Sequence, residues 1–178
     1  MVKERENLTR ELRNLDLQTQ SILTKLADYS DEVLSILPDP GVWSVMQVLT
    51  HVMMSERLSL QYVRKKLSFK PELKKSGLLA ACRLLLLKWS QYIPIRFKAP
   101  KGLQTEDLPV FSSLTELRTQ WHKDRHKLHQ FFAEADDSLF SKEVFRHPIA
   151  GRLSLIQMVS FFSIHLQRHV VQIEARLP

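Results

Sequence analysis

The chain has 178 residues and a formal net charge of +7, with 44% hydrophobic and 25% charged residues. These proportions are ordinary for a soluble globular protein, and the length suits one domain, residues 1–178, with a well-buried core. The single cysteine, Cys82, excludes an internal disulfide, and no apolar run approaches the ~20 residues that span a bilayer.

The N-terminal residues 1–8 are charged and lack the apolar core of a signal peptide, so we expect a cytoplasmic protein. The densest basic cluster covers residues 64–66 and continues with Lys70, Lys74 and Lys75. A net charge of +7 raises the possibility of nucleic-acid binding. Because no zinc finger, aromatic RNA-binding signature or obvious helix-turn-helix accompanies the cluster, we interpret it as a solvated basic surface. We therefore predict no nucleic-acid partner. The lack of an apolar run long enough to span a bilayer predicts no membrane partner.

The first predicted helix covers residues 4–37. Its apolar positions recur every three, four or seven residues and make one stripe: Leu8, Leu12, Leu15, Ile22, Leu26, Tyr29, Val33 and Leu37. The sequence Pro38-Asp39-Pro40-Gly41 ends the helix, because proline disfavours a helical residue before it and has no backbone donor.

The second predicted helix begins at Ser44 and continues to about residue 67. Ser44 and Gln47 have the spacing of a capping box, and Trp43 and Val48 have that of a hydrophobic staple. With about 100° of turn per residue, His51 falls at the edge of the apolar face of this helix. His51 is therefore predicted to point inward, either as an ordinary core histidine or as part of a site.

The central residues 68–112 are less regular. Residues 78–92 predict a helix that is apolar nearly all round, which indicates burial or a subunit contact. Pro94, Pro100, Gly102 and Pro109 then predict an extended connection. A connection this long permits a crossover between the second and third helices of a bundle.

The third predicted helix runs from Ser113, which forms a capping box with Glu116, to about residue 132. It carries three histidines at helical spacing, His122, His126 and His129. These fall away from the apolar stripe and alternate with basic residues, which disfavour a metal cation. We interpret them as solvent-facing.

The fourth predicted helix repeats the start of the second, with Ser154 and Gln157 as its capping box, and continues to about residue 177. His165 and His169 are four residues apart and lie beside its buried face. Two stacked histidines and an inward His51 suggest a common partner, although most such pairs bind nothing.

Their levels along the helices can be compared at about 1.5 Å of rise per residue. The levels agree better when the second and fourth helices run antiparallel. We therefore predict an all-α four-helix bundle with up-down-down-up order and a long crossover between helices 2 and 3.

Three segments together resemble the DinB-like superfamily of four-helix bundles. They are WSVMQVLTHVMMSE at residues 43–56, FRHPIAGRLSLIQ at 145–157 and FSIHLQRHVVQI at 162–173. The resemblance implies a divalent metal held by His51, His165 and His169. It also implies a relation to metal-dependent hydrolases and to transferases of low-molecular-weight thiols such as bacillithiol, many of which are homodimers.

Three neutral imidazoles leave a divalent ion an open position for water or substrate, and they suit Zn, Ni, Cu or Fe. The expected function is therefore thiol transfer or hydrolysis of a small molecule, and the alternative is a non-enzymatic, dimerising helical bundle. No general base is evident, because Glu56 points away from His51 on its helix. Gln172 is either a contact of the site or solvent-facing, and we favour solvent. Cys82 is disfavoured as a nucleophile, because apolar surroundings raise a thiol pKa.

Overall fold

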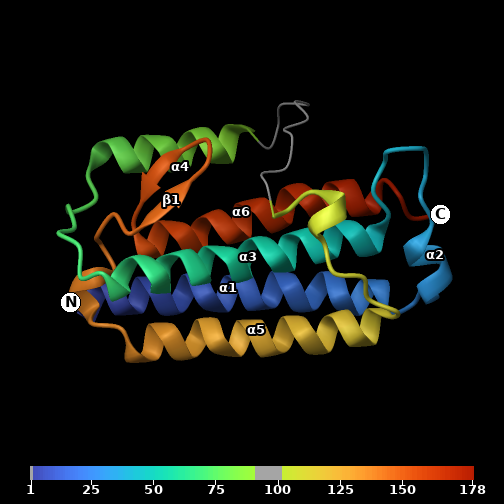
Figure 1. Cartoon of the computed structure of the whole chain (residues 1–178), viewed down its shortest axis with the longest axis horizontal. Helices are drawn as coiled ribbons and strands as arrows, with labels where there is room; N and C mark the ends of the chain where they lie inside the picture. Colours follow the sequence, from blue (N-terminus) through green and yellow to red (C-terminus); the bar gives the residue numbers. More distant parts are fainter. Residues whose placement is uncertain (1, 91–101) are drawn as a thin grey trace.

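The computed structural model describes residues 2–90 and 102–178. Within these residues it contains six α-helices, two short 3₁₀ helices and one two-stranded sheet (Figure 1). The described chain is mostly helical, in agreement with the predicted all-α class. No helix in the described part of the chain is long and apolar enough to cross a membrane.

Four long helices make up most of the molecule: α1 (Val2–Leu26), α3 (Val45–Ser68), α5 (Leu114–Glu134) and α6 (Leu155–Glu174). They lie side by side, and the colours of Figure 1 show α1 and α6 running in one direction and α3 and α5 in the other. Helix α6 packs against both α1 and α3, and α3 also packs against α5. Their facing sides enclose a core that includes Trp121, Phe132 and Phe162.

The first helix is shorter than predicted. It ends at Leu26, and a separate short helix, α2 (Asp31–Ser35), follows after a turn. The side chain of Ser30 accepts a hydrogen bond from the backbone N–H of Val33 and so starts a new helix within the predicted one. Along the apolar stripe, Leu26 is the last fully buried residue, Tyr29 and Val33 are half-buried, and Leu37 is exposed.

The predicted capping boxes of α3 and α6 are both formed. In α3, the Gln47 N–H donates to Ser44 Oγ at 3.2 Å, and the Ser44 N–H donates to Gln47 Oε1 at 2.9 Å. Ser154 and Gln157 repeat this arrangement in α6 with the same two distances. Each box satisfies backbone donors that the first turn of a helix leaves free, so it fixes where the helix begins.

Only half of the third predicted capping box is present. Ser113 accepts from the Glu116 N–H at 3.1 Å, whereas the Glu116 carboxylate accepts from the backbone and hydroxyl of Ser112. The helix still begins where predicted, at Leu114.

A β-hairpin between α5 and α6 was not predicted. Strands β1 (Phe145–His147) and β2 (Gly151–Leu153) pair antiparallel, with Phe145 opposite Leu153. Gly151 has a backbone φ of +77°, a conformation that residues other than glycine rarely adopt. Helix α4 (Leu78–Ser90) lies along this hairpin and α6 (Figure 1).

For residues 78–92 the sequence predicted burial or a subunit contact, and burial within the chain is contradicted for the described residues 78–89. The subunit contact stays a prediction, and residues 91–92 lie outside the described residues. Among the α4 side chains that the structure describes, only Ala80 is fully buried, and Leu78 is 87% exposed. The helix is a superficial layer, and one of its apolar faces has no cover from the described chain. Pro94 and Pro100 of the predicted extended connection lie outside the described residues. The described part after them contains a short 3₁₀ helix, Thr105–Asp107.

Candidate metal centre

The three histidines of the candidate site come from two helices that pack against each other. His51 lies about two turns after the capped start of α3, and His165 and His169 lie in the second half of α6. Because α3 and α6 run in opposite directions (Figure 1), the beginning of one lies beside the end of the other. The levels of the histidines in the sequence favoured this direction.

The structure brings the three rings together. The Nε2 atoms of His165 and His169 are 3.0 Å apart, and their ring centroids are 4.5 Å apart. The His51 ring lies 5.2 Å from that of His165 and 5.0 Å from that of His169. One nitrogen from each ring lies within 4.8 Å of the other two, so the group could hold a metal ion.

Hydrogen bonds on the outer sides of two rings fix which nitrogen is free to act as a ligand. His169 Nδ1 is 2.9 Å from Gln172 Oε1, and His51 Nδ1 is 3.4 Å from the carbonyl oxygen of Leu103. Both partners are amide oxygens, which can only accept. Each Nδ1 therefore carries the proton, and the lone pair of each ring is on Nε2, on the inner side. Such outer hydrogen bonds orient histidine ligands in metal sites.

The spacing of the two α6 nitrogens also fits an ion. With a metal–nitrogen bond of about 2.0–2.1 Å, neighbouring ligand nitrogens lie about 3.0 Å apart in octahedral and about 3.4 Å apart in tetrahedral geometry. The His165–His169 separation of 3.0 Å agrees with the first of these. The donor set therefore suits a divalent transition metal.

All three imidazoles are held in their neutral form. Burial lowers the pKa of His169 to about 3, and it also lowers the pKa of His51. Burial is the largest cause that holds the pKa of His165 well below its usual range, and the repulsion that protonated His169 and His51 would exert lowers it further. A neutral imidazole is the form that binds a metal, so the site is ready at neutral pH.

Two aromatic rings flank the histidines. The Trp43 ring lies 5.0 Å from that of His51, and the Phe161 ring stacks at 5.3 Å on His165. The Trp43 indole N–H donates to Thr105 Oγ1 at 2.7 Å, which ties the residues after the crossover to this end of α3. These contacts give the group a partly apolar surrounding.

The structure places three other residues that the sequence suggested as possible members of the site. Gln172, which we expected to face solvent, is half-buried and bonded to His169, as described above. Glu56 points away as expected and binds Arg125 on the opposite side of α3. Cys82 is exposed on α4 and does not belong to the histidine group.

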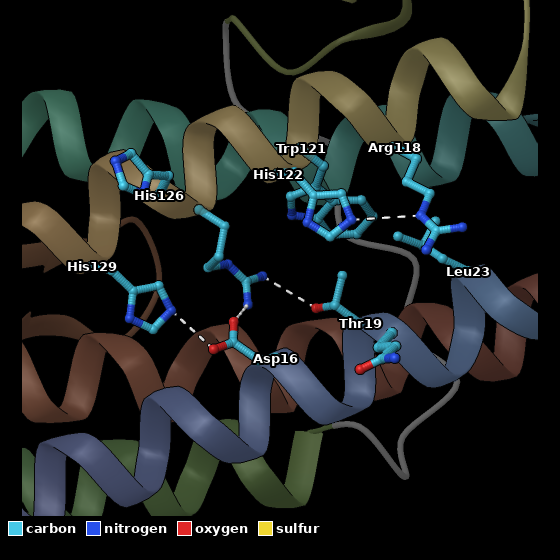
Figure 2. Close-up of a pocket in the computed structure, with 10 residues that line it drawn as sticks. Asp16, Thr19, Leu23, Arg118, Trp121, His122, His126 and His129 are labelled. Carbon is cyan, nitrogen blue, oxygen red and sulfur yellow. Dashed lines mark hydrogen bonds and ion pairs between the residues drawn. The ribbon is translucent and has the colours of Figure 1, made fainter.

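The histidines of α5 lie in a different place, along a groove of about 480 Å³ between α1 and α5 (Figure 2). His122 and His126 are exposed, as predicted. His129 is half-buried, with its Nε2 2.9 Å from Asp16 Oδ2. Among the described residues, the α5 histidines do not bring three ligand atoms as close together as His51, His165 and His169 do.

The comparisons with known proteins give one match. A family model described as the DinB superfamily matches residues 14–173, a range that includes His51, His165 and His169. No curated protein and no solved structure matches the chain significantly.

Proposed function

The chain belongs to the DinB superfamily, and we propose that it is a metal-dependent enzyme whose divalent ion is held by His51, His165 and His169. The observation that carries this proposal is the convergence of three neutral imidazoles, two of which have their Nδ1 bonded to an outer oxygen acceptor. A divalent ion with three protein ligands and an open position lowers the pKa of water, or deprotonates a thiol, that binds there.

The reaction that we propose is thiol transfer or hydrolysis of a small molecule. Gln172 and the carbonyl of Leu103 keep His169 and His51 in the tautomers that can bind the ion. The rings of Trp43 and Phe161 offer apolar surface to the part of a substrate that lies next to the reacting group. Zn, Ni and Fe all suit imidazole ligands, and we include all three in the proposal.

Metal analysis of protein purified without a histidine tag tests the site. We expect about one equivalent of a divalent transition metal per chain, as for a single three-ligand site. The double variant His51→Ala/His165→Ala is expected to lose it. A matched control is His122→Ala/His126→Ala, which removes two exposed histidines of α5 and is expected to bind as the parent does. Equal metal binding by the parent and the His51→Ala/His165→Ala variant would refute the proposal.

The choice between the two reactions can be tested on the Co²⁺-loaded protein. Addition of a low-molecular-weight thiol is expected to produce a thiolate-to-cobalt charge-transfer band, because a coordinating thiol is deprotonated. Such a band, together with thiol consumption in the presence of an electrophile, supports thiol transfer. Turnover of ester or amide substrates without a thiol supports hydrolysis.

The alternative is a non-enzymatic, dimerising helical bundle. The observation in its favour is the 3.0 Å contact between His165 Nε2 and His169 Nε2, which can be a simple hydrogen bond between core side chains. In that case the tag-free protein holds no metal and the His51→Ala/His165→Ala variant changes stability alone.

For the architecture we propose one domain, residues 1–178, in which α1, α3, α5 and α6 form an up-down-down-up four-helix bundle. The helix directions and contacts described above support this order. We also propose a cytoplasmic homodimer, and sedimentation equilibrium would establish whether two copies associate.

A further inference from the structure

The outward face of α4 is apolar and exposed. Leu78 is 87% exposed, and Leu79, Leu85, Leu86 and Trp89 are each between 56% and 69% exposed. At about 100° per residue these five positions fall within about 120° of the helix circumference. They therefore form one continuous stripe rather than scattered apolar side chains.

This stripe is additional to the face that α4 already packs. Ala80 is buried, and Leu84 and Leu87 are partly buried against the core. Because these residues hold the helix on α6 and the hairpin, the outer leucines cannot turn inward without exposing the inner ones. An exposed apolar stripe of this extent on a folded protein marks an interaction surface.

Residues 74–89, which include nearly all of α4 and the residues directly before it, carry basic and no acidic side chains. Exposed Lys74 and Lys75 precede α4, exposed Lys88 lies in its last turn, and α4 itself contains no acidic residue. Among the described residues, none of these three lysines forms an ion pair shorter than 4.0 Å.

The neighbouring hairpin adds a second, independent sign of an anionic partner. Arg146 of β1 lies directly opposite Arg152 of β2, and both side chains are exposed. Like charges directly opposite each other destabilise a strand pair. Arg83 of α4 donates to the backbone carbonyl of Arg152 at 3.4 Å, so a third arginine contacts the hairpin.

We propose that α4 and the hairpin together dock the protein on an anionic lipid bilayer. The leucines of the stripe lie at the boundary between headgroups and acyl chains, and the lysines and arginines contact lipid phosphates. An amphipathic helix with basic flanks binds membrane surfaces in this way, with each basic residue near the surface adding to the attraction. With 13 residues, α4 lies along the surface and does not cross it.

A membrane surface fits this face better than a second copy of the chain. In a symmetric dimer built on α4, the basic residues of one copy would meet those of the other or face them across a narrow gap. The anionic lipids of the cytoplasmic leaflet supply the opposite charge. The sequence-based prediction of no membrane partner concerned spanning segments and did not consider a helix lying on the surface.

Co-sedimentation of the full chain with lipid vesicles tests the proposal. We expect binding to vesicles of phosphatidylserine and phosphatidylcholine, weaker binding at high salt, and none to phosphatidylcholine alone. Trp89 fluorescence should shift to the blue on binding, and this shift should be absent in Trp89→Phe.

Two pairs of variants, each with a matched control, locate the surface. Leu85→Gln/Leu86→Gln should weaken vesicle binding at least about tenfold, since it removes apolar side chains from the interface. Its control, Leu17→Gln/Val171→Gln, changes two apolar residues that are exposed on other helices and should bind as the parent does.

Arg146→Gln/Arg152→Gln should weaken binding about 10- to 30-fold. Its control, Arg13→Gln/Arg118→Gln, makes the same change in net charge on α1 and α5. No binding to anionic vesicles at low salt would overturn the proposal. So would equal losses in variants and controls, or a dimer that Leu85→Gln/Leu86→Gln dissociates, since a second copy would then cover the stripe.

Discussion

Replacing Arg125 by methionine is expected to lower the free energy of unfolding by about 3–5 kcal/mol, the usual cost of breaking a buried ion pair. Arg125 lies on α5 and is 7% exposed. Its Nη2 donates to both carboxylate oxygens of Glu56 on α3, at 2.8 and 2.9 Å. It also reaches α1, at Asp16 Oδ1 (2.7 Å) and Thr19 Oγ1 (3.1 Å), so one side chain connects three helices.

The large expected cost comes from the group that Arg125 leaves behind. Glu56 is 5% exposed, and among the described residues its other side-chain partner is the indole N–H of Trp121 at 3.2 Å. Burial raises the pKa of Glu56 even with Arg125 present, and Arg125 and Trp121 work against that effect. Without Arg125 the carboxylate is either an uncompensated buried charge or must take up a proton.

The double variant Glu56→Met/Arg125→Met separates the pair from its parts. Removing both charges and filling the space with apolar side chains is often close to neutral. The bonds from Arg125 to Asp16 and Thr19 are still lost, at about 1 kcal/mol each. We therefore expect the double variant to be more stable than Arg125→Met, with a coupling energy of about 3 kcal/mol, at the upper end of couplings between contacting residues.

Urea unfolding followed by far-UV circular dichroism measures these differences by linear extrapolation. The control is Arg57→Met, because Arg57 pairs with Asp124 at 2.6 Å but keeps a quarter of its side chain exposed. Arg57→Met should lose less free energy of unfolding, about 1–2 kcal/mol, since water and neighbouring groups can replace Arg57 as the partner of Asp124. Additive costs in the double variant, or an Arg125→Met cost no larger than that of Arg57→Met, would contradict the reasoning.

Three further predictions concern the site and its supports. Gln172→Leu should weaken metal affinity about 10- to 100-fold, measured by competition with a chelator, because His169 loses the acceptor of its Nδ1–H. Ser154→Ala should cost about 1 kcal/mol in urea unfolding, because the start of α6 loses half of its capping box. His147→Asn should make stability less sensitive to acid. Burial lowers the pKa of His147 to about 4 from 6.5, so its neutral form contributes about 3 kcal/mol above pH 6.5 that is lost as pH falls to about 4. If His147→Asn and the parent lost the same free energy of unfolding between pH 7 and pH 4, the titration of His147 would be excluded as the cause.

The helix starts could be predicted because their signals are local. Ser44 with Gln47, and Ser154 with Gln157, each satisfy donors within one turn of the chain, so the residue types alone indicate the boundary. The end of the first helix at Leu26 was missed although its signal is also local. Ser30 was available as a cap, but the apolar spacing continued past it and favoured one long helix.

Features that depend on contacts between distant residues could not be predicted in this way. Glu56 and Arg125 are 69 residues apart, and helical periodicity marks each only as a polar residue near a buried face. The exposed stripe of α4 could not be predicted for a different reason. A sequence that is apolar on all sides of a helix predicts that the helix is covered, but it does not indicate what covers it. The described chain covers only one side.

The histidine group lies between these two cases. The spacing of His165 and His169 is local and follows from the helix alone, whereas the approach of His51 depends on the direction in which α3 passes α6. The two capping boxes made that approach predictable, because they fix the level of each histidine along its helix. Gln172 was misplaced since its position on the helix wheel lies at the edge of the buried face, and only the neighbouring His169 ring decides which way an amide turns. A residue at such an edge is best judged by whether an adjacent buried group still lacks a hydrogen-bond partner.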